Sequence, residues 1–271
     1  VEPMRIIDVH GHIGNWTFPM RCSSVNHLVD LMNRCGIEKS VVSHSSAITY
    51  DFVEGNRKLA EAIEVGDDIW GYIVLNPHYD QRSLAELDSY RDNPKFVGVK
   101  LHPEQQEYRL IHRNVQGLLD RVEKLGLPVL VHTFPGQIAD LCQVAKEFPK
   151  VKFIMGHMGG NDWAAGIRAA ADRENIWLEP CSSFPDAGKI NQAVQTVGAE
   201  RVLFGSDSSL LNPAFIWGML RDAGLNQDDL EKIAYQNAQG IFRFEREGVE
   251  QKGRVQVVRG FGRSFHNTRG N

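Results

Sequence analysis

The stretch "IIDVHGHIG", residues 6–14, joins an apolar, β-branched run to the histidines His10 and His12. Side chains two apart on a β-strand point to the same face, and Gly11 between the two histidines leaves room for the backbone. The stretch therefore predicts a strand that ends in two imidazoles on one face. Asp8 is expected on the same face, one step deeper, where it would orient a ligand by a hydrogen bond.

Seven further apolar runs follow, separated by amphipathic segments. Strands alternating with helices are typical of βα units in a parallel sheet, and near-continuous apolar runs indicate strands covered on both faces. The predicted strands are 4–9, 39–43, 69–75, 96–101, 128–131, 151–156, 175–180 and 201–205. Predicted helices include 24–35, 54–65, 112–125, 136–147 and 186–197, and several are followed by a glycine that suits a helix end, at Gly36, Gly66, Gly126 and Gly198.

Eight βα units within residues 1–246 match the length of a (β/α)8 TIM barrel, whereas a doubly wound open sheet usually has fewer strands. We therefore predict an α/β protein with one barrel domain, 1–246. The Gly- and Arg-rich segment 247–271 breaks the pattern and is predicted to be a short C-terminal extension that packs on the surface or on a partner subunit.

The composition favours small-molecule chemistry. The formal net charge is −4 and the pI is about 6.2, without a basic run in the first 245 residues, so a nucleic-acid partner is not expected. The four cysteines are widely spaced and read as reduced thiols, which favours a cytoplasmic protein. The chain has no apolar run of transmembrane length, so no membrane partner is expected.

Histidines follow most of the predicted strands. In a barrel the carboxyl ends of the strands converge on one mouth, so residues far apart in sequence become neighbours there. One such histidine alone would most simply be a hydrogen-bonded core residue, but seven in equivalent places favour metal ligands. Imidazole and carboxylate ligands suit Zn²⁺ in a catalytic site that keeps one position open. The residues at these strand ends are His10, His12, His44, His78, His102, His132, His157 and, after the last strand, Asp207.

In this order, "DVHGHIG", "GVKLHPEQQEY", "LPVLVHT", "FIMGHMGG" and "VLFGSDSS" resemble the amidohydrolase superfamily, in the branch that includes aminocarboxymuconate-semialdehyde decarboxylase. The likeness covers residues 5–243. It implies one divalent metal ion, usually zinc with manganese as the alternative, held by His10, His12, His132 and Asp207. It also implies that His157 acts on the water that the metal activates, that Asp207 shares in proton transfer, and that the protein forms a homodimer.

The fourth predicted strand complicates this interpretation. Lys100 and His102 share a face of it, and some amidohydrolases use a carboxylated lysine on that strand to bridge two metals. Lys100 in that role would make His157 a ligand of a second ion. Because the other motifs resemble the branch without the bridge, we expect one ion. The predicted substrate-binding residues are then Lys100, His102, Trp16, Phe134 and Glu179.

The predicted activity is hydrolysis of an amide, lactone or related carbonyl bond of a small molecule. The alternative is non-oxidative decarboxylation of an unsaturated or aromatic carboxylate at the same site. A decarboxylase is expected to hold a carboxylate through a bidentate arginine, and no arginine lies directly at a predicted strand end. A TatD-like nuclease is disfavoured by "VKLHP" in the fourth strand, where it would have a metal-binding Glu. A structural zinc site is disfavoured by the absence of cysteine ligands.

Overall fold

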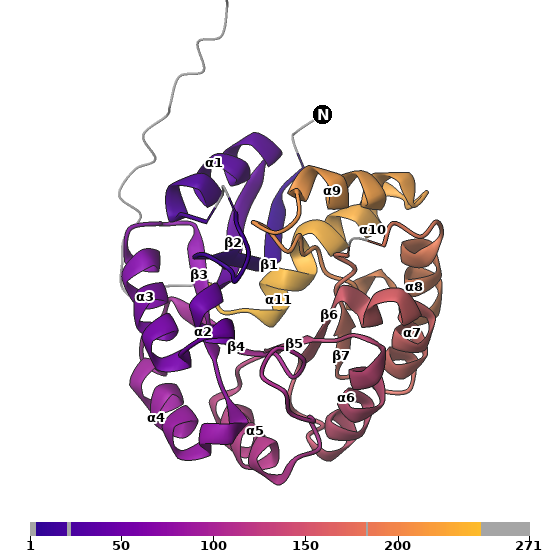
Figure 1. Ribbon diagram of the computed structural model, residues 1–271. Helices are drawn as coiled ribbons and strands as arrows, with labels where there is room; N and C mark the ends of the chain where they lie inside the picture. Colours follow the sequence, from indigo (N-terminus) through magenta and orange to yellow (C-terminus); the bar gives the residue numbers. More distant parts are fainter. Residues whose placement is uncertain (1–3, 21–22, 183, 245–271) are drawn as a thin grey trace, which may run out of the picture.

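The computed structural model describes residues 4–20, 23–182 and 184–244. In this part of the chain one curled sheet of seven parallel strands lies at the centre, with helices around it (Figure 1). The strands stand side by side in chain order, each paired with the next. They are β1 (Ile6–Ile13), β2 (Ile37–His44), β3 (Ile69–Val74), β4 (Phe96–Leu101), β5 (Val129–His132), β6 (Phe153–Gly156) and β7 (Ile176–Leu178).

Most helices lie between successive strands in sequence, the last four α-helices follow β7, and together they surround the sheet (Figure 1). The α-helices are α1 (Val25–Cys35), α2 (Ser45–Thr49), α3 (Phe52–Glu64), α4 (Asp80–Tyr90), α5 (Arg113–Leu125), α6 (Pro135–Glu147), α7 (Trp163–Ala171), α8 (Lys189–Val197), α9 (Pro213–Asp222), α10 (Gln227–Glu231) and α11 (Asn237–Ile241). Four shorter helical turns are η1 (Pro77–Tyr79), η2 (His157–Asp162), η3 (Ala199–Arg201) and η4 (Lys232–Gln236). Helices α1 and α5 end as predicted, at glycines in the left-handed conformation, Gly36 and Gly126.

The predicted eighth strand, 201–205, is where the structure departs from the expected (β/α)8 barrel. This segment forms no regular strand: Val202 makes one isolated bridge to β7, and Ser208 makes another to β1. The chain leaves the extended conformation at Asp207, whose φ of 55° is left-handed, so regular pairing cannot continue through it. The parallel α/β sheet is confirmed for seven strands, and an irregular segment lies between the seventh and the first.

Two apolar layers hold the sheet in place. The larger layer packs the outer face of the strands against the helices, for example Ile37 of β2 and Met32 of α1. The smaller layer fills the inside of the curled sheet with Ile7, Tyr72 and Leu130, together with Phe242 after α11. The inner layer supports the strand ends from below, so the side chains at those ends have fixed positions.

A β-bulge in β1 changes the face that two of its residues occupy. Asp8 pairs with Ser40 and Gly11 pairs with Val42, so Val9 and His10 together oppose one residue of β2. Strict alternation, which placed Asp8 and His10 on one face, is therefore broken, and that prediction is wrong. The Asp8 carboxylate instead accepts hydrogen bonds from the backbone N–H of His10 (3.1 Å) and of Ser206 (2.9 Å).

Three further predictions concern membrane-spanning helices, the cysteines and the C-terminal segment. No described helix is long and apolar enough to cross a bilayer. Cys35, Cys142 and Cys181 carry free thiols. The predicted extension 247–271 lies outside the described residues, as does the end of the predicted domain from residue 245.

Candidate metal centre

Five of the seven histidines at strand ends converge at one mouth. They are linked by close ring contacts, with centroid separations of 5.2 Å for His10 and His12, 4.6 Å for His132 and His157, and 3.9 Å for His102 and His132. The other two, His44 and His78, make local hydrogen bonds outside this cluster. His44 caps α2 by accepting the Ser46 N–H, and His78 Nε2 bonds to the carbonyl oxygen of Gln106 at 2.9 Å.

His10 is held by its outer nitrogen. Its Nδ1 donates to Glu179 Oε2 at 2.7 Å, and both side chains are buried. The lone pair of the ring is therefore on Nε2, which points into the centre. Nε2 lies 3.8 Å from Asp207 Oδ1. Lys100 Nζ lies 2.9 Å from the same Nε2. A ring held by a carboxylate at one nitrogen, with the other nitrogen turned toward the centre, is the usual arrangement of a metal-binding histidine, although here that second nitrogen is in contact with Lys100.

His12 lies beside His10 and is held in a similar way. It pairs in register with Ser43 of β2, and the Ser43 hydroxyl is 2.9 Å from its Nδ1. Its Nε2 lies 3.1 Å from Asp207 Oδ1. The inner nitrogens of His10 and His12 and one Asp207 oxygen all lie within 4.8 Å of one another, close enough to share one metal ion.

His132 and His157 face each other at the carboxyl ends of β5 and β6. His132 Nε2 donates to the Glu104 carboxylate at 2.7 Å, and His157 Nδ1 donates to the Cys181 carbonyl at 3.0 Å. Each neutral ring therefore has its lone pair on the other nitrogen, and those nitrogens, His132 Nδ1 and His157 Nε2, lie 3.0 Å apart. Two lone pairs at this distance repel unless a proton or a cation lies beside them.

Burial keeps these rings neutral. It lowers the pKa of His10, His12, His102 and His132, and lowers that of His157 to about 3. A shared proton is therefore disfavoured, and a divalent cation is the better partner for the inward lone pairs. Nitrogen and carboxylate ligands of this kind suit zinc and manganese. Of the four predicted ligands, His10, His12 and Asp207 have donor atoms close enough to share one ion, whereas His132 is not part of that group in the described structure.

The neighbouring charged groups are also shifted by burial. The pKa of Lys100 falls to about 8, and the pKa of Glu179 rises to about 8 although hydrogen bonds from Cys181 favour its ionised form. For Asp207, burial raises the pKa, but the hydrogen bond with His12 and the nearby imidazoles hold it below its ordinary value. Of the two central carboxyl groups, Asp207 is therefore the one that is ionised at neutral pH, whereas the pKa of Glu179 is raised.

Two of the central residues have unusual backbone conformations. His157 has φ 63° and Asp207 has φ 55°, a left-handed conformation that typically costs a non-glycine residue about 1–3 kcal/mol. The Asp207 N–H donates to the carbonyl oxygen of His10 at 2.7 Å, which ties the irregular segment to β1. The rest of the fold holds both side chains toward the centre despite this cost.

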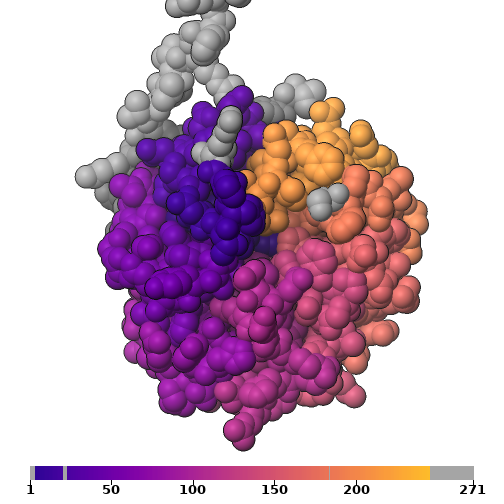
Figure 2. All heavy atoms as spheres, viewed as in Figure 1, coloured from indigo at the N-terminus to yellow at the C-terminus, as the bar shows by residue number. Residues whose placement is uncertain are grey.

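A cavity of about 360 Å³ opens above these residues. Figure 2 shows this part of the surface, where the indigo N-terminal, magenta and orange C-terminal segments meet around a hollow. Its walls are His12, His102, His132, His157 and Asp207 with Trp16, Thr17, Phe18, Glu104, Gln105, Glu107 and Leu210. It is large enough for a small organic substrate.

The five predicted substrate residues fall into two groups. Trp16 and His102 line the cavity. Phe134 stacks on His132 (4.9 Å between ring centroids) without lining it. Lys100 and Glu179 are fully buried and are not among the residues that line it, so their part in substrate binding stays a prediction.

Three contact residues were missed from the sequence: Ser43, Glu104 and Cys181. Glu104 stands in the quoted "LHPEQ" motif, where a carboxylate two residues after His102 was a usable signal. Ser43 could be found only from the β1–β2 register, and Cys181 only from the path of the chain after β7.

The chain matches a known protein family. Residues 7–244 match the family model described as amidohydrolase. Among curated proteins, the chain is similar to gamma-resorcylate decarboxylase from Polaromonas sp. (strain JS666 / ATCC BAA-500), with 26% identity over 121 residues. That stretch is 37% of this chain and 36% of the decarboxylase, so the match spans about a third of that relative.

Solved structures share the fold. A dihydroxybenzoic acid decarboxylase from Polaromonas sp. JS666 with bound manganese and an inhibitor superposes with a TM-score of 0.70 and 16% identity, over 88% of this chain and 97% of that one. A protein from Acinetobacter baumannii described as a 2-pyrone-4,6-dicarboxylic acid hydrolase superposes with a TM-score of 0.65 and 18% identity, over 88% and 99%. The same architecture thus occurs in proteins described as a decarboxylase and as a hydrolase.

Proposed function

This chain belongs to the amidohydrolase family of enzymes, and from that premise we propose that it hydrolyses a carbonyl bond of a small molecule with one divalent metal ion. The substrate class is an amide, a lactone or a related carbonyl compound. The observation that supports this most directly is the set of inward lone pairs on neutral imidazoles beside the ionised Asp207.

The metal would be held by His10, His12, His132 and Asp207. We propose zinc, because three imidazoles and one carboxylate suit it, with manganese as the alternative. The ion would supply a Lewis acid that polarises the carbonyl and lowers the pKa of water. The proposal needs no bridge to a second ion. Lys100 Nζ lies 2.9 Å from His10 Nε2, the nitrogen that would bind the ion, so Lys100 would have to give up this contact when the ion binds.

His157 would be the general base. Its Nδ1–H is committed to the Cys181 carbonyl, so Nε2 is free to take a proton from the attacking water. The imidazolium that results is stabilised by Asp207, whose charge already acts on His157. Asp207 would then help return the proton to the leaving group.

The walls of the cavity support hydrolysis of an uncharged substrate. Glu104 and Glu107 place carboxylates at its edge, while Trp16 and Phe18 stack on each other with ring centroids 6.2 Å apart. No arginine or lysine lines the cavity among the described residues. Arg109, which lies in the segment between β4 and α5 and could donate to a substrate carboxylate from there, is paired with Asp140 at 2.6 Å.

Decarboxylation is the second candidate, with specific support from the likeness to gamma-resorcylate decarboxylase. In that case the buried ammonium of Lys100 is the group that could attract a substrate carboxylate. It would have to exchange its contact with His10 for the substrate, and it lies below the cavity rather than in its wall.

One experiment tests the proposal. Purified protein is analysed for bound metal, then assayed for hydrolysis of a panel of neutral lactones and amides and for CO₂ release from aromatic and unsaturated carboxylates. We expect about one ion per chain and activity on neutral carbonyl compounds that is lost on chelation. Release of CO₂ without hydrolysis would promote the decarboxylase, and a protein that cannot bind a divalent metal would refute both.

A further inference from the structure

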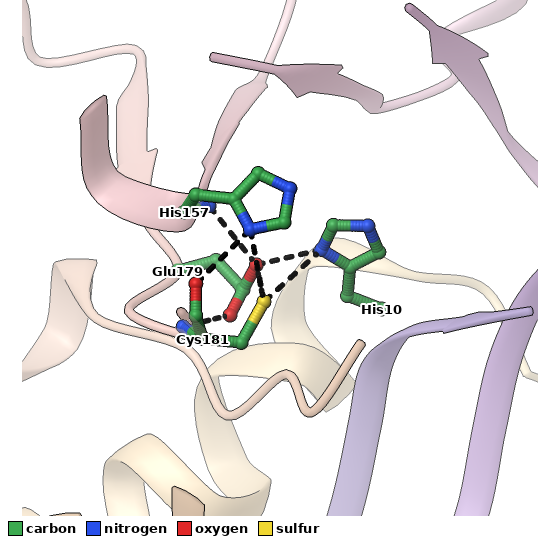
Figure 3. A group of neighbouring side chains, drawn as sticks. All are labelled: His10, His157, Glu179 and Cys181. Atoms are coloured by element: carbon green, nitrogen blue, oxygen red, sulfur yellow. Dashed lines mark hydrogen bonds and ion pairs between the residues drawn. The ribbon is translucent and has the colours of Figure 1, made fainter. Parts of the chain in front are cut away.

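A second cluster of polar side chains lies beneath the candidate metal centre, on the outer side of His10 and His157 (Figure 3). Glu179 and Cys181 follow β7 and are fully buried. In Figure 3 the Glu179 carboxylate and the Cys181 side chain lie between the two imidazole rings. The cluster does not line the cavity, so substrate contact does not explain it.

Donors converge on the Glu179 carboxylate. Its Oε2 accepts from His10 Nδ1 at 2.7 Å, from the Cys181 thiol at 3.0 Å and from the His157 backbone N–H at 3.4 Å. Its Oε1 accepts from the Cys181 backbone N–H at 2.6 Å. One carboxylate therefore fixes a ring of the centre, the backbone of a second residue and the turn that follows β7.

That turn holds His157 in its tautomer. The Cys181 carbonyl accepts the His157 Nδ1–H at 3.0 Å, and the Cys181 sulfur lies farther from the same nitrogen, at 3.5 Å. The backbone of Cys181 is therefore the closer partner, and it leaves the lone pair of His157 on Nε2, toward the centre. The carbonyl is placed by the same residue whose N–H is bound to Glu179. His10 and His157 are thus oriented by one network.

The fold provides the space for this carboxylate at Gly205. A Cβ atom added there would lie 2.6 Å from Glu179 Cγ and Cδ, closer than such atoms approach. Gly205 belongs to the irregular segment that also carries Asp207. The three atoms nearest to such a Cβ all belong to Glu179, so an alanine at this position would displace the Glu179 side chain.

We propose that Glu179 is a positioning residue that aims His10 Nε2 at the metal and, through Cys181, holds His157 Nε2 toward the attacking water. This inference rests on the proposed function, because it needs a metal that His10 binds. Partners of this kind around a metal-binding histidine typically change metal affinity or activity by about 10–100-fold when replaced. The four side chains could instead form a metal site of their own, since their donor atoms lie within 4.8 Å of one another. The 2.7 Å contact between His10 and Glu179 is a hydrogen-bond length, which favours positioning.

The test measures metal affinity by competition with a chelator, using Zn²⁺, and records the visible spectrum of the Co²⁺-loaded protein. Glu179→Gln keeps the size of the side chain but replaces one carboxylate oxygen by an N–H₂ group, which cannot accept a hydrogen bond. The single remaining oxygen cannot serve all the donors of His10 and Cys181. We expect about 10–100-fold weaker zinc binding and an altered cobalt spectrum. Glu86→Gln is the matched control, because Glu86 is also buried but bonds to Asn56, away from the centre. It should leave both readouts unchanged.

Two further variants separate positioning from structure. Gly205→Ala should weaken zinc binding in the same direction, so it decides the question if Glu179→Gln does not fold. Cys181→Ser keeps the backbone carbonyl and a donor, so it should bind one zinc ion with nearly normal affinity.

Each contrary outcome has a distinct meaning. If Glu179→Gln and Gly205→Ala both bind zinc as tightly as the wild type, Glu179 has no positioning role. The proposed function would still stand in that case, because the wild type binds the metal. Two ions in the wild type and one in Cys181→Ser would overturn it in favour of a second metal site. A wild type that binds no metal would refute the proposed function itself.

Discussion

Two buried lysines at opposite ends of β4 show how the two ends of the sheet differ. Lys95, just before the strand, donates to three carbonyl oxygens, those of Gly66 and Asp67 at 2.8 Å and of Ile69 at 3.1 Å. Lys100, five residues later, has one hydrogen bond within the described structure, to His10 Nε2. Both side chains are at most 1% exposed, although an ammonium has three N–H donors.

The amino-terminal end of the sheet is therefore built for stability. Asn175, also at that end, donates to three carbonyl oxygens at 3.0 Å, so buried polar groups there find ordinary partners. At the carboxyl end, lone pairs face one another and His157 and Asp207 have left-handed backbones. In TIM barrels the carboxyl end of the sheet carries function and the amino-terminal end carries stability, and the contrast between the two ends of this sheet is of the same kind.

The largest expected effect is at the carboxyl end. His157→Asn should lower turnover by about 10²–10⁴-fold, because a general base is lost, while bound metal stays near the wild-type level. Turnover and metal content per chain are the measurements. His44→Asn is the control at a strand end outside the cluster, and asparagine can replace its capping contact. Loss of metal in His157→Asn would make His157 a ligand instead.

At the amino-terminal end the effect should be on stability. Lys95→Met leaves three carbonyl oxygens without this donor and should lower the free energy of unfolding by about 3 kcal/mol, with kcat/KM changed less than about two-fold. Urea denaturation and steady-state kinetics measure the two. Lys124→Met, on the exposed side of α5, should change stability by less than about 0.5 kcal/mol. If Lys95→Met and Lys124→Met changed the free energy of unfolding by the same amount, the hydrogen bonds of Lys95 would not stabilise the amino-terminal end of the sheet.

The other buried lysine should behave in the opposite way. Lys100→Met removes a buried charge with little compensation and should raise the free energy of unfolding of the metal-free protein by about 1 kcal/mol while lowering activity. The same denaturation series measures it. A loss of stability as large as that of Lys95→Met would show that Lys100 is structural.

The smallest expected effect concerns an ion pair at the start of β1 and β2. Arg5 and Lys39 lower the pKa of Glu38 from 4.5 to about 2. The pair therefore contributes fully above about pH 4.5, and its contribution is lost as the pH falls toward 2. Because Arg5 is largely exposed, we expect less than about 1 kcal/mol. Wild type and Glu38→Gln should differ in unfolding midpoint at pH 6 and converge near pH 2. A difference that persists at pH 2 would contradict this.

Much of the fold could be predicted from the sequence because the apolar periodicity is local. Seven predicted strands are present, and helices such as α1 and α5 begin and end within one residue of the predicted bounds. The eighth strand was predicted from "RVLFG", yet this segment makes only an isolated bridge to β7, and the chain turns at Asp207 two residues after it, which periodicity does not report. The position of Asp8 was missed because a β-bulge depends on the partner strand.

The sequence by itself determined which residues stand at the strand ends, because strand length and helix length follow from the pattern of apolar side chains. It thereby selected His10, His12, His132, His157 and Asp207 as candidates. Only the tertiary structure decided which nitrogen of each ring faces inward, since this depends on Glu179, Ser43, Glu104 and the Cys181 carbonyl, which reach the rings from other segments of the chain. Hydrogen bonds between distant segments have no local signature, so the orientation of the centre is a property of the folded chain.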